Sequence, residues 1–279
     1  MRKNLILIGS NSLLYQQIKS DIEHRYENIF RFDKTKVISK NKEPNQALDF
    51  TNVKNKFNFS DPNIHHDVFI LAAHTAGSPK IDDNVKILEN SLEWLGKLKN
   101  LRIFFFSSAL CEIYEKIYKI NPEMANKMTY AKSKTKCENI LRNKVKCENI
   151  SLRIPYVIFP QRTGIFKFAK KVSNTFGLPI PFNKNNYFPY CNSSELSDLI
   201  CFLLDDSLTK GTNRNKVVNC WNSSNVTIEG LVSAYGKELN PIWISSQIGV
   251  RVLWFLSKLK FIPFCEEQII PFIEISSHK

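Results

Sequence analysis

Short apolar runs alternate with helical patterns over the first half of the chain. The apolar runs are rich in β-branched and aromatic residues, and each has the length of one buried strand. Between them, apolar residues recur at helical spacing. Alternation of this kind predicts an α/β fold, with a parallel sheet covered by helices on both faces. The predicted strands are 5–8, 29–32, 67–73, 101–106 and 150–154, and the predicted helices lie near 12–25, 83–99 and 127–142.

The pattern changes after Pro155, where prolines and aromatic residues crowd the next thirty-five positions. We therefore expect two domains, the first over 1–155 and a smaller, interleaved lobe over 156–279. Within the second part, residues 194–220 are expected to return to the first domain, because Val217 to Cys220 have the pattern of one more strand. Helices are predicted near 164–176, 194–205 and 227–238.

Residues 248–264 form the longest apolar stretch near the end of the chain. The stretch is too short to span a membrane, and Arg251, Lys258 and Lys260 interrupt it. A helix that packs its apolar side on the second lobe is favoured. The alternative is a basic amphipathic helix that makes a peripheral contact with a membrane surface.

Composition narrows the class of protein. The 279 residues are 43% hydrophobic and 23% charged, which is typical of a globular domain, and the net charge of +13 favours anionic partners. No stripe of basic and aromatic residues indicates nucleic-acid binding. The seven cysteines include no CxxC pair and no Cys/His cluster, so we expect reduced thiols, no metal site and a cytoplasmic location. The apolar run at the start is too short for a signal peptide.

Residues 5–15, LILIGSNSLLY, have the pattern of a strand, a tight turn at Gly9 and the start of a helix. This order is typical of the phosphate-binding turn of dinucleotide-binding folds. Two further glycines are usual in such a loop, but Ser12 and Tyr15 stand in their places. Because a helix N-terminus binds anions through its free N–H groups, we expect a looser but intact site. An empty remnant of such a site is the alternative.

Residues 129–141, TYAKSKTKCENIL, carry the candidate chemistry. Tyr130 and Lys134 are four residues apart, so a helix places both side chains on one face. A lysine ammonium there favours the phenolate form of the tyrosine, which can then exchange a proton with a substrate hydroxyl. Ser108 ends the buried strand before this helix, at the sheet edge where open α/β folds bind ligands, and can donate a hydrogen bond to a substrate oxygen.

These motifs resemble the extended short-chain dehydrogenases/reductases of the NAD-dependent epimerase/dehydratase family, which act on nucleotide sugars. The resemblance spans nearly the whole chain and implies a Rossmann-type, doubly wound parallel sheet with a smaller substrate lobe. The motifs that carry it are the loop at Gly9, Asp33, Asp49-Phe50, Leu71-Ala72-Ala73, Asn90, Ser107-Ser108, Tyr130 to Lys134 with Glu138, and Leu152 to Pro155.

The resemblance also implies roles for individual residues. Tyr130 would be the acid/base, Lys134 its activator and a ribose ligand, and Ser108 the group that polarises the reacting oxygen. Asp33 would bind the ribose hydroxyls and favour NAD, although Lys34 and Lys36 leave NADP as the alternative. The implied cofactor-binding residues are Gly9, Ser12, Asp33, Asp49, Phe50, Ala72, Asn90, Lys134 and Pro155, and Arg162, Lys167 and residues 180–190 would lie near the nucleotide diphosphate.

One departure from the family narrows the expected reaction. The family's dehydratases carry an Asp-Glu pair directly after the serine, whereas this chain has Ala109 and Leu110. We therefore expect an NAD(P)-dependent epimerase or keto-sugar reductase rather than a dehydratase, and a homodimer. Cys111 is expected to be a buried thiol, with an extra acid/base as the alternative. The alternative function is that of a non-catalytic or weakly active relative that serves as a binding or scaffold protein.

Overall fold

The computed structural model describes residues 3–34, 46–52, 64–75, 78–96, 98–158, 178–180, 190–205, 215–220 and 241–243. Contacts divide the chain into two compact units. Unit 1 comprises Met1–Cys111, Tyr130–Ile154 and Ser193–Cys220, and unit 2 comprises Glu112–Thr129, Pro155–Asn192 and Trp221–Lys279. The predictions for 164–176, 227–238, 248–264, Lys36, Arg162 and Lys167 lie outside the described residues, as do residues 181–189.

Unit 1 contains a seven-stranded sheet in which every described pairing is parallel. The spatial order is β10-β6-β5-β4-β1-β2-β3, so the chain winds outward from β1 in both directions. This doubly wound topology places a switch point between β1 and β4 and confirms the predicted fold class. The strands are β1 (Lys3–Ile8), β2 (Asn28–Asp33), β3 (Gln46–Ala47), β4 (His65–Ile70), β5 (Leu101–Ser108), β6 (Glu148–Ile154) and β10 (Asn215–Asn219).

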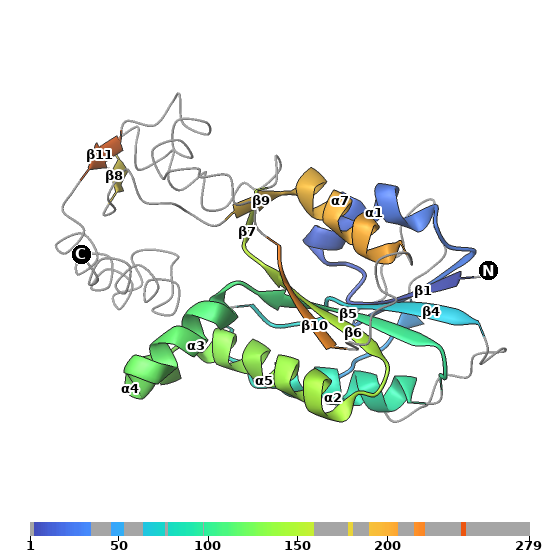
Figure 1. Ribbon diagram of the computed structural model, residues 1–279, viewed down its shortest axis with the longest axis horizontal. Helices are drawn as coiled ribbons and strands as arrows, with labels where there is room; N and C mark the ends of the chain where they lie inside the picture. The colour runs from blue at the N-terminus through green and yellow to red at the C-terminus, as the bar shows by residue number, and fades with distance from the viewer. Residues whose placement is uncertain are drawn as a thin grey trace. The chain divides into compact units, whose positions relative to one another are not determined.

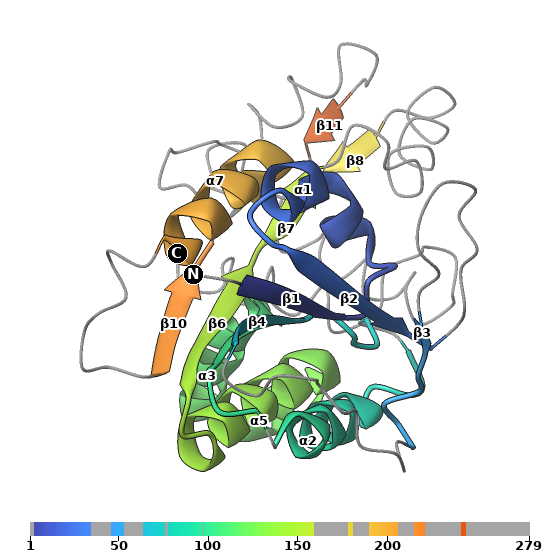
Figure 2. The same cartoon turned by 90° about the vertical axis from the view of Figure 1, so that its right-hand side faces the viewer.

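Helices cover both faces of this sheet (Figures 1 and 2). One face carries α1 (Leu13–Glu23) and α7 (Ser193–Leu204), and the other carries α2 (Asp83–Leu95) and α5 (Thr129–Lys144). Ser197 of α7 donates to the Asp21 carboxylate of α1 over 2.6 Å, which joins the two helices. Each of these four helices corresponds to a helix that the sequence predicts.

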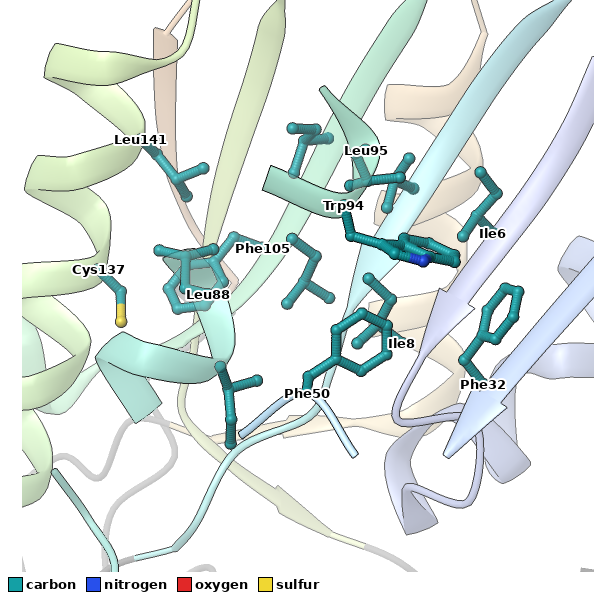
Figure 3. Packing of buried hydrophobic residues seen from close by; sticks show 14 residues of the cluster. Ile6, Ile8, Phe32, Phe50, Leu88, Trp94, Leu95, Phe105, Cys137 and Leu141 are labelled. Atoms are coloured by element: carbon teal, nitrogen blue, oxygen red, sulfur yellow. The ribbon is translucent and has the colours of Figure 1, made fainter. Parts of the chain in front are cut away.

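The apolar core of unit 1 follows from strands that are buried on both faces. All four apolar residues from Leu5 to Ile8 are fully buried, as expected for the central strand of a parallel sheet. Ile6, Ile8 and Phe105 point toward the layer of α2 and α5 (Figure 3). There, the Trp94 ring packs edge-on against Phe32, with centroids 4.8 Å apart. The layer therefore holds α2 and α5 firmly on the sheet.

Unit 2 contains shorter elements. In it, β7 (Tyr156–Ile158) pairs with β9 (Tyr190–Asn192), and β8 (Leu178–Ile180) pairs with β11 (Pro241–Trp243). Asn121 caps α4 (Pro122–Asn126) by accepting from the Met124 N–H over 3.0 Å. The sequence did not predict α3 (Leu110–Ile120), which begins in unit 1 and continues in unit 2. No described helix is long and apolar enough to cross a membrane.

Candidate active site

The predicted site residues of unit 1 cluster at one edge of the sheet. The parallel strands β1, β2, β4, β5 and β6 have their carboxyl ends at this edge. Gly9 follows β1, Asp33 ends β2, Ala72 follows β4 and Ser108 ends β5. In open α/β sheets, ligands bind outside these ends, next to the switch point. The topology therefore places the predicted residues where a ligand site is expected.

Gly9 permits close contact between the first loop and the segment after β4. Its φ is +88°, and a Cβ added there would lie 2.5 Å from the Ala72 backbone nitrogen. The Gly9 N–H donates to the Phe32 carbonyl over 2.9 Å, while the Ala72 N–H donates to Ile8 over 2.9 Å. Only glycine adopts this positive φ readily, and only glycine lacks the Cβ that would clash with Ala72. Gly9 and Ala72 thus lie side by side, directly beyond the carboxyl ends of β1 and β4.

The N-terminus of α1 follows this turn. Ser12 is the N-cap residue of α1, and its carbonyl accepts from the Gln16 N–H over 3.0 Å. Within this turn, every residue of which is described, the Ser12 hydroxyl makes no capping hydrogen bond. No acidic side chain lies in the first turn of α1, which the structure describes in full. Ser10 Oγ is buried and has no hydrogen-bond partner among the described residues. A helix start of this kind suits an anionic group such as a phosphate.

Tyr15 occupies the place of a glycine without blocking the turn. Its side chain is only 1% exposed and shares the buried face of α1 with Ile18 and Ile22. The hydroxyl donates to Glu23 Oε1 over 2.9 Å, and Glu23 in turn pairs with Arg31 of β2 over 2.9 Å. Burial, with Glu23 as a second cause, raises the pKa of Tyr15. The Tyr15 hydroxyl is therefore neutral, and its hydrogen bond to Glu23 lies at the C-terminal end of α1.

Asp33 ties the first loop to the end of β2. Its Oδ2 accepts from the Asn11 N–H and its Oδ1 accepts from the Lys34 N–H, each over 2.8 Å. A carboxylate has further lone pairs that can accept from ribose hydroxyls. The Lys34 ammonium lies 2.9 Å from Asp49 Oδ2. Hydrogen bonds from Thr51, with a smaller contribution from Lys34, lower the pKa of Asp49 to about 2.

The structure places Phe50 and Asn90 in a packing role. Phe50 is 4% exposed, and its ring lies edge-on to Trp94 with centroids 5.4 Å apart. The Asn90 amide donates to the Phe50 carbonyl over 2.7 Å, which fixes the segment after β3 against α2. Pro155 follows β6 and is half-buried. That these three residues bind the cofactor stays a prediction.

Tyr130 and Lys134 lie in the first two turns of α5, which pack against the end of β5. Lys134 Nζ donates to the Phe106 carbonyl over 2.8 Å, and it lies 5.9 Å from the Tyr130 ring centroid. Burial lowers the pKa of Lys134, while Cys137, Cys111 and Glu138 act in the opposite direction. Ser108 Oγ accepts from the Leu110 N–H over 3.2 Å, which leaves its own proton available to donate. Tyr130 is half-buried.

Sequence reasoning missed Asn84, which links the segment after β4 to α5. Asn84 is 3% exposed, and its amide donates to the His74 carbonyl and to Ser133 Oγ, each over 3.1 Å. Its Oδ1 accepts from the His74 N–H over 2.6 Å. Ser133 in turn donates to the Tyr130 carbonyl over 2.8 Å. The signal in the sequence is a polar residue on the apolar face of a helix that follows a strand.

The two residues directly after Ser108, Ala109 and Leu110, supply neither an acid nor a base. Ala109 is 8% exposed and donates its N–H to the Ile154 carbonyl over 3.0 Å, and Leu110 starts α3. Cys111 is fully buried, with its sulfur 3.4 Å from Ser107 Oγ. Burial raises the pKa of Cys111 to about 11, which agrees with the expected buried thiol. The described residues contain no group of three or more His, Cys, Asp or Glu that could hold a metal ion.

Comparison with known proteins finds similarity in structure but not in sequence. No family model and no curated protein matches the sequence. The UDP-N-acetylglucosamine 4-epimerase from Bacillus cereus is 16% identical, with a TM-score of 0.62 over 87% of this chain and 85% of the other. The UDP-glucuronic acid 4-epimerase from the same organism, solved with UDP-glucuronic acid and NAD, is 13% identical, with a TM-score of 0.61 over 99% and 100%.

A human epimerase family protein solved with NADPH is 11% identical, with a TM-score of 0.64 over 97% of this chain and 88% of the other. These alignments cover nearly the whole chain. At such low identity the similarities establish the fold alone, and the reaction has to be inferred from the site residues. The chain has the Rossmann-type fold of the NAD-dependent epimerases, as the sequence resemblance to the extended short-chain dehydrogenases/reductases predicted.

Proposed function

We propose that the protein is an NAD(P)-dependent nucleotide-sugar epimerase or keto-sugar reductase. The observation that carries this proposal is that Lys134 lies near the Tyr130 ring on α5 and donates to the Phe106 carbonyl of β5, the strand that ends at Ser108. A tyrosine, a lysine and a serine are the groups needed to move a proton at a sugar hydroxyl. The fold, shared with NAD-dependent epimerases, supports the same class of reaction.

The first loop fits a dinucleotide. Gly9 leaves no room for a Cβ beside the Ala72 backbone, which keeps the turn tight, and the α1 N-terminus and the buried Ser10 hydroxyl suit a phosphate. Asp33 would accept from the ribose hydroxyls, and its charge disfavours a 2′-phosphate. Lys34, the cation next to it, is paired with Asp49. These contacts support NAD over NADP. When bound, the nicotinamide supplies an acceptor and donor of hydride at the sugar carbon.

The chain's own residues then handle the proton. Tyr130 would take the proton of the sugar hydroxyl as the carbon is oxidised and return it on reduction. Ser108 would donate a hydrogen bond to the same oxygen and stabilise its developing charge. Lys134, whose ammonium lies near the Tyr130 ring, would stabilise the phenolate between the two steps.

Dehydration is disfavoured. Removing water from the sugar requires an acid and a base in addition to the proton carrier, and the positions next to Ser108 hold Ala109 and Leu110. Cys111 is buried with a raised pKa, so its thiol does not replace them. An epimerase or a reductase requires only the serine, tyrosine, lysine and nicotinamide. Whether the purified protein retains NAD separates the two, because an epimerase regenerates its cofactor in every turnover.

The test is a screen of nucleotide hexoses, repeated with Tyr130→Phe. NAD-linked absorbance detects net reduction, chromatographic separation of isomeric products detects epimerisation, and mass analysis detects loss of water. We expect Tyr130→Phe to lower the rate about 100- to 10,000-fold, since it removes only the hydroxyl that carries the proton. NADH binding and the melting temperature should stay unchanged. Tyr118→Phe is the control, because this tyrosine is half exposed on α3 and should leave the rate unaltered.

Two outcomes would contradict parts of the proposal. If Tyr130→Phe keeps more than about a tenth of the rate, well above what loss of an acid–base group leaves, Tyr130 is not the proton carrier. A product that has lost one water would overturn the argument from Ala109 and Leu110. A protein that binds NADH but transfers no hydride to any nucleotide sugar would support the binding or scaffold alternative.

A further inference from the structure

Two buried arginine–carboxylate pairs lie near opposite ends of the strands in unit 1. Near the amino ends, Arg102 Nε of β5 is 2.7 Å from Asp67 Oδ1 of β4, and both side chains are 1% exposed. Near the carboxyl ends, a terminal guanidinium nitrogen of Arg153 of β6 is 2.7 Å from Glu138 Oε2 of α5, with exposures of 8% and 1%. A buried ion pair adds little net stability, because both charges lose their hydration. Each pair therefore calls for a separate explanation.

The contacts of the Arg102–Asp67 pair explain it as a structural anchor. Arg102 donates to the carbonyls of Leu203 and Leu204 over 3.3 and 3.2 Å. These are the last two residues of α7, whose carbonyls lack partners within the helix. Tyr26 donates to Asp67 Oδ2 over 2.9 Å. The pair thus fastens α7 and the turn before β2 to the sheet, at the end remote from Ser108.

The Glu138–Arg153 pair instead connects the elements that carry the proposed catalytic residues. Arg153 Nε lies 3.1 and 3.2 Å from the two carboxylate oxygens of Glu138, in addition to the shorter contact. Glu138 Oε1 also accepts from Ser107 Oγ over 2.6 Å. One carboxylate therefore joins α5 to β5 and to β6. These three elements lie next to one another in Figure 1.

The place of Glu138 along the chain makes this connection relevant to the reaction. Ser107 directly precedes Ser108, and Glu138 is four residues beyond Lys134 and eight beyond Tyr130. Residues four apart share a face of a helix, so the carboxylate lies on the same side of α5 as the candidate pair. We infer that Glu138, held by Arg153, is a positioning residue that fixes α5 against β5 so that Tyr130 and Ser108 reach the same substrate oxygen.

This inference rests on the proposed function. Catalytic groups must be held within about 0.5 Å of their productive positions, and a displacement of about 1 Å can cost 100-fold in rate. Apolar contacts of α5 such as those of Cys137 and Leu141 exclude water but are not directional. Charge-assisted hydrogen bonds are directional, so they can fix the rotation and axial position of the helix. Glu138 would contribute to the rate without contacting substrate or cofactor.

The experiment compares the two pairs, with the full chain and with the nucleotide hexose that gives the highest rate in the screen. Glu138→Gln keeps the shape of the side chain but removes the charge that faces Arg153. The double variant Glu138→Leu/Arg153→Met removes both charges, so no unpaired charge remains in the core. Asp67→Asn and Asp67→Leu/Arg102→Met are the matched controls. Melting temperature, NADH affinity, kcat and KM are measured for each, at a temperature where all variants are folded.

We expect both Glu138 variants to lower kcat at least about 10-fold with KM changed less than about threefold, which is the pattern for an interaction needed mainly in the transition state. The double variant should regain melting temperature relative to Glu138→Gln without regaining kcat. Both Asp67 variants should lower the melting temperature and leave kcat within about twofold, because they perturb the opposite end of the sheet.

Three results would overturn the inference. A Glu138→Leu/Arg153→Met variant with a kcat within about twofold of wild type would show that the pair contributes only to stability. An equal loss of kcat in the Asp67 variants would show that any buried pair has this effect. A wild-type protein that turns over no nucleotide sugar would overturn the proposed function, and the inference with it. If the wild-type protein is active and the Glu138 variants are equally active, the inference is overturned but the proposed function is not.

Discussion

Gly9 is the residue at which the first strand turns into the candidate cofactor loop. We predict that Gly9→Ala lowers the free energy of unfolding by about 1–3 kcal/mol, because φ is +88° and the new Cβ would lie 2.5 Å from the Ala72 nitrogen. Gly96→Ala is the control. There φ is −59° and the nearest atom, the Glu93 carbonyl oxygen, is 3.2 Å away, so a change below about 1 kcal/mol is expected. Equal losses in urea unfolding would contradict this account of Gly9.

Asp33 determines the cofactor preference in our proposal. Asp33→Ala should weaken NADH binding more than NADPH binding, because it removes an acceptor for the ribose hydroxyls together with a charge that repels the 2′-phosphate. Calorimetric titration with both cofactors measures the difference. Asp205→Ala, at an exposed carboxylate paired with Arg25, should change neither affinity. Equal weakening of both cofactors by Asp33→Ala would remove the ribose assignment.

The sequence predicts some site residues better than others for a physical reason. Tyr130 and Lys134 lie on one helix, so their spacing alone brings them together. Asn84 acts through contacts with His74 and Ser133 that only the tertiary structure creates. Asn84 and Asn90 both lie on α2, and the sequence did not show which amide reaches α5. The structure places Asn84 there and directs Asn90 to the Phe50 carbonyl.

At the scale of elements, burial on both faces made the central strands easy to predict. The predicted strands 5–8, 29–32, 101–106 and 150–154 fall within β1, β2, β5 and β6. The prediction of 67–73 was wrong at its end, because β4 stops at Ile70 and the Leu71 and Ala72 N–H groups both donate to Ile8. Helix α3 was missed because only Ala109 separates it from β5, so no turn-forming segment marks where the helix begins.

The anchor between α7 and the sheet leads to a prediction on acid stability. Burial raises the pKa of Asp67, but the hydrogen bonds and charges of His65 and Arg102 lower it to about 2, from a usual 3.8. The unfolded chain therefore binds this proton more readily than the folded one. The resulting stability is present above about pH 4 and is lost as the pH falls toward 2.

Urea unfolding of wild type and Asp67→Asn at pH 7 and pH 3 measures this contribution. The stability advantage of wild type should be smaller at pH 3, by on the order of 1–2 kcal/mol, because asparagine does not titrate. An unchanged difference between the two proteins across this range would contradict the assignment to Asp67.

At the scale of the whole molecule, the alternation of strands and helices was enough to predict the fold class. The solved structures share that fold at only 11–16% identity. This is expected when burial patterns rather than particular residues specify an architecture. The predicted substrate contacts at Arg162 and Lys167 lie outside the described residues. Their segment is rich in proline and aromatic residues, and it does not show the alternation of strands and helices that made unit 1 predictable.

The central claim is that the carboxyl edge of this sheet binds a nicotinamide dinucleotide. Calorimetric titration of the 279-residue chain with NADH tests it most directly, with Gly9→Ala as the comparison. We predict saturable binding to one site per chain with a Kd below about 1 mM, the upper end of common working affinities, and weaker binding by Gly9→Ala. No heat of binding at millimolar NADH, from a protein shown to be folded by circular dichroism and to carry no bound NAD, would contradict the claim.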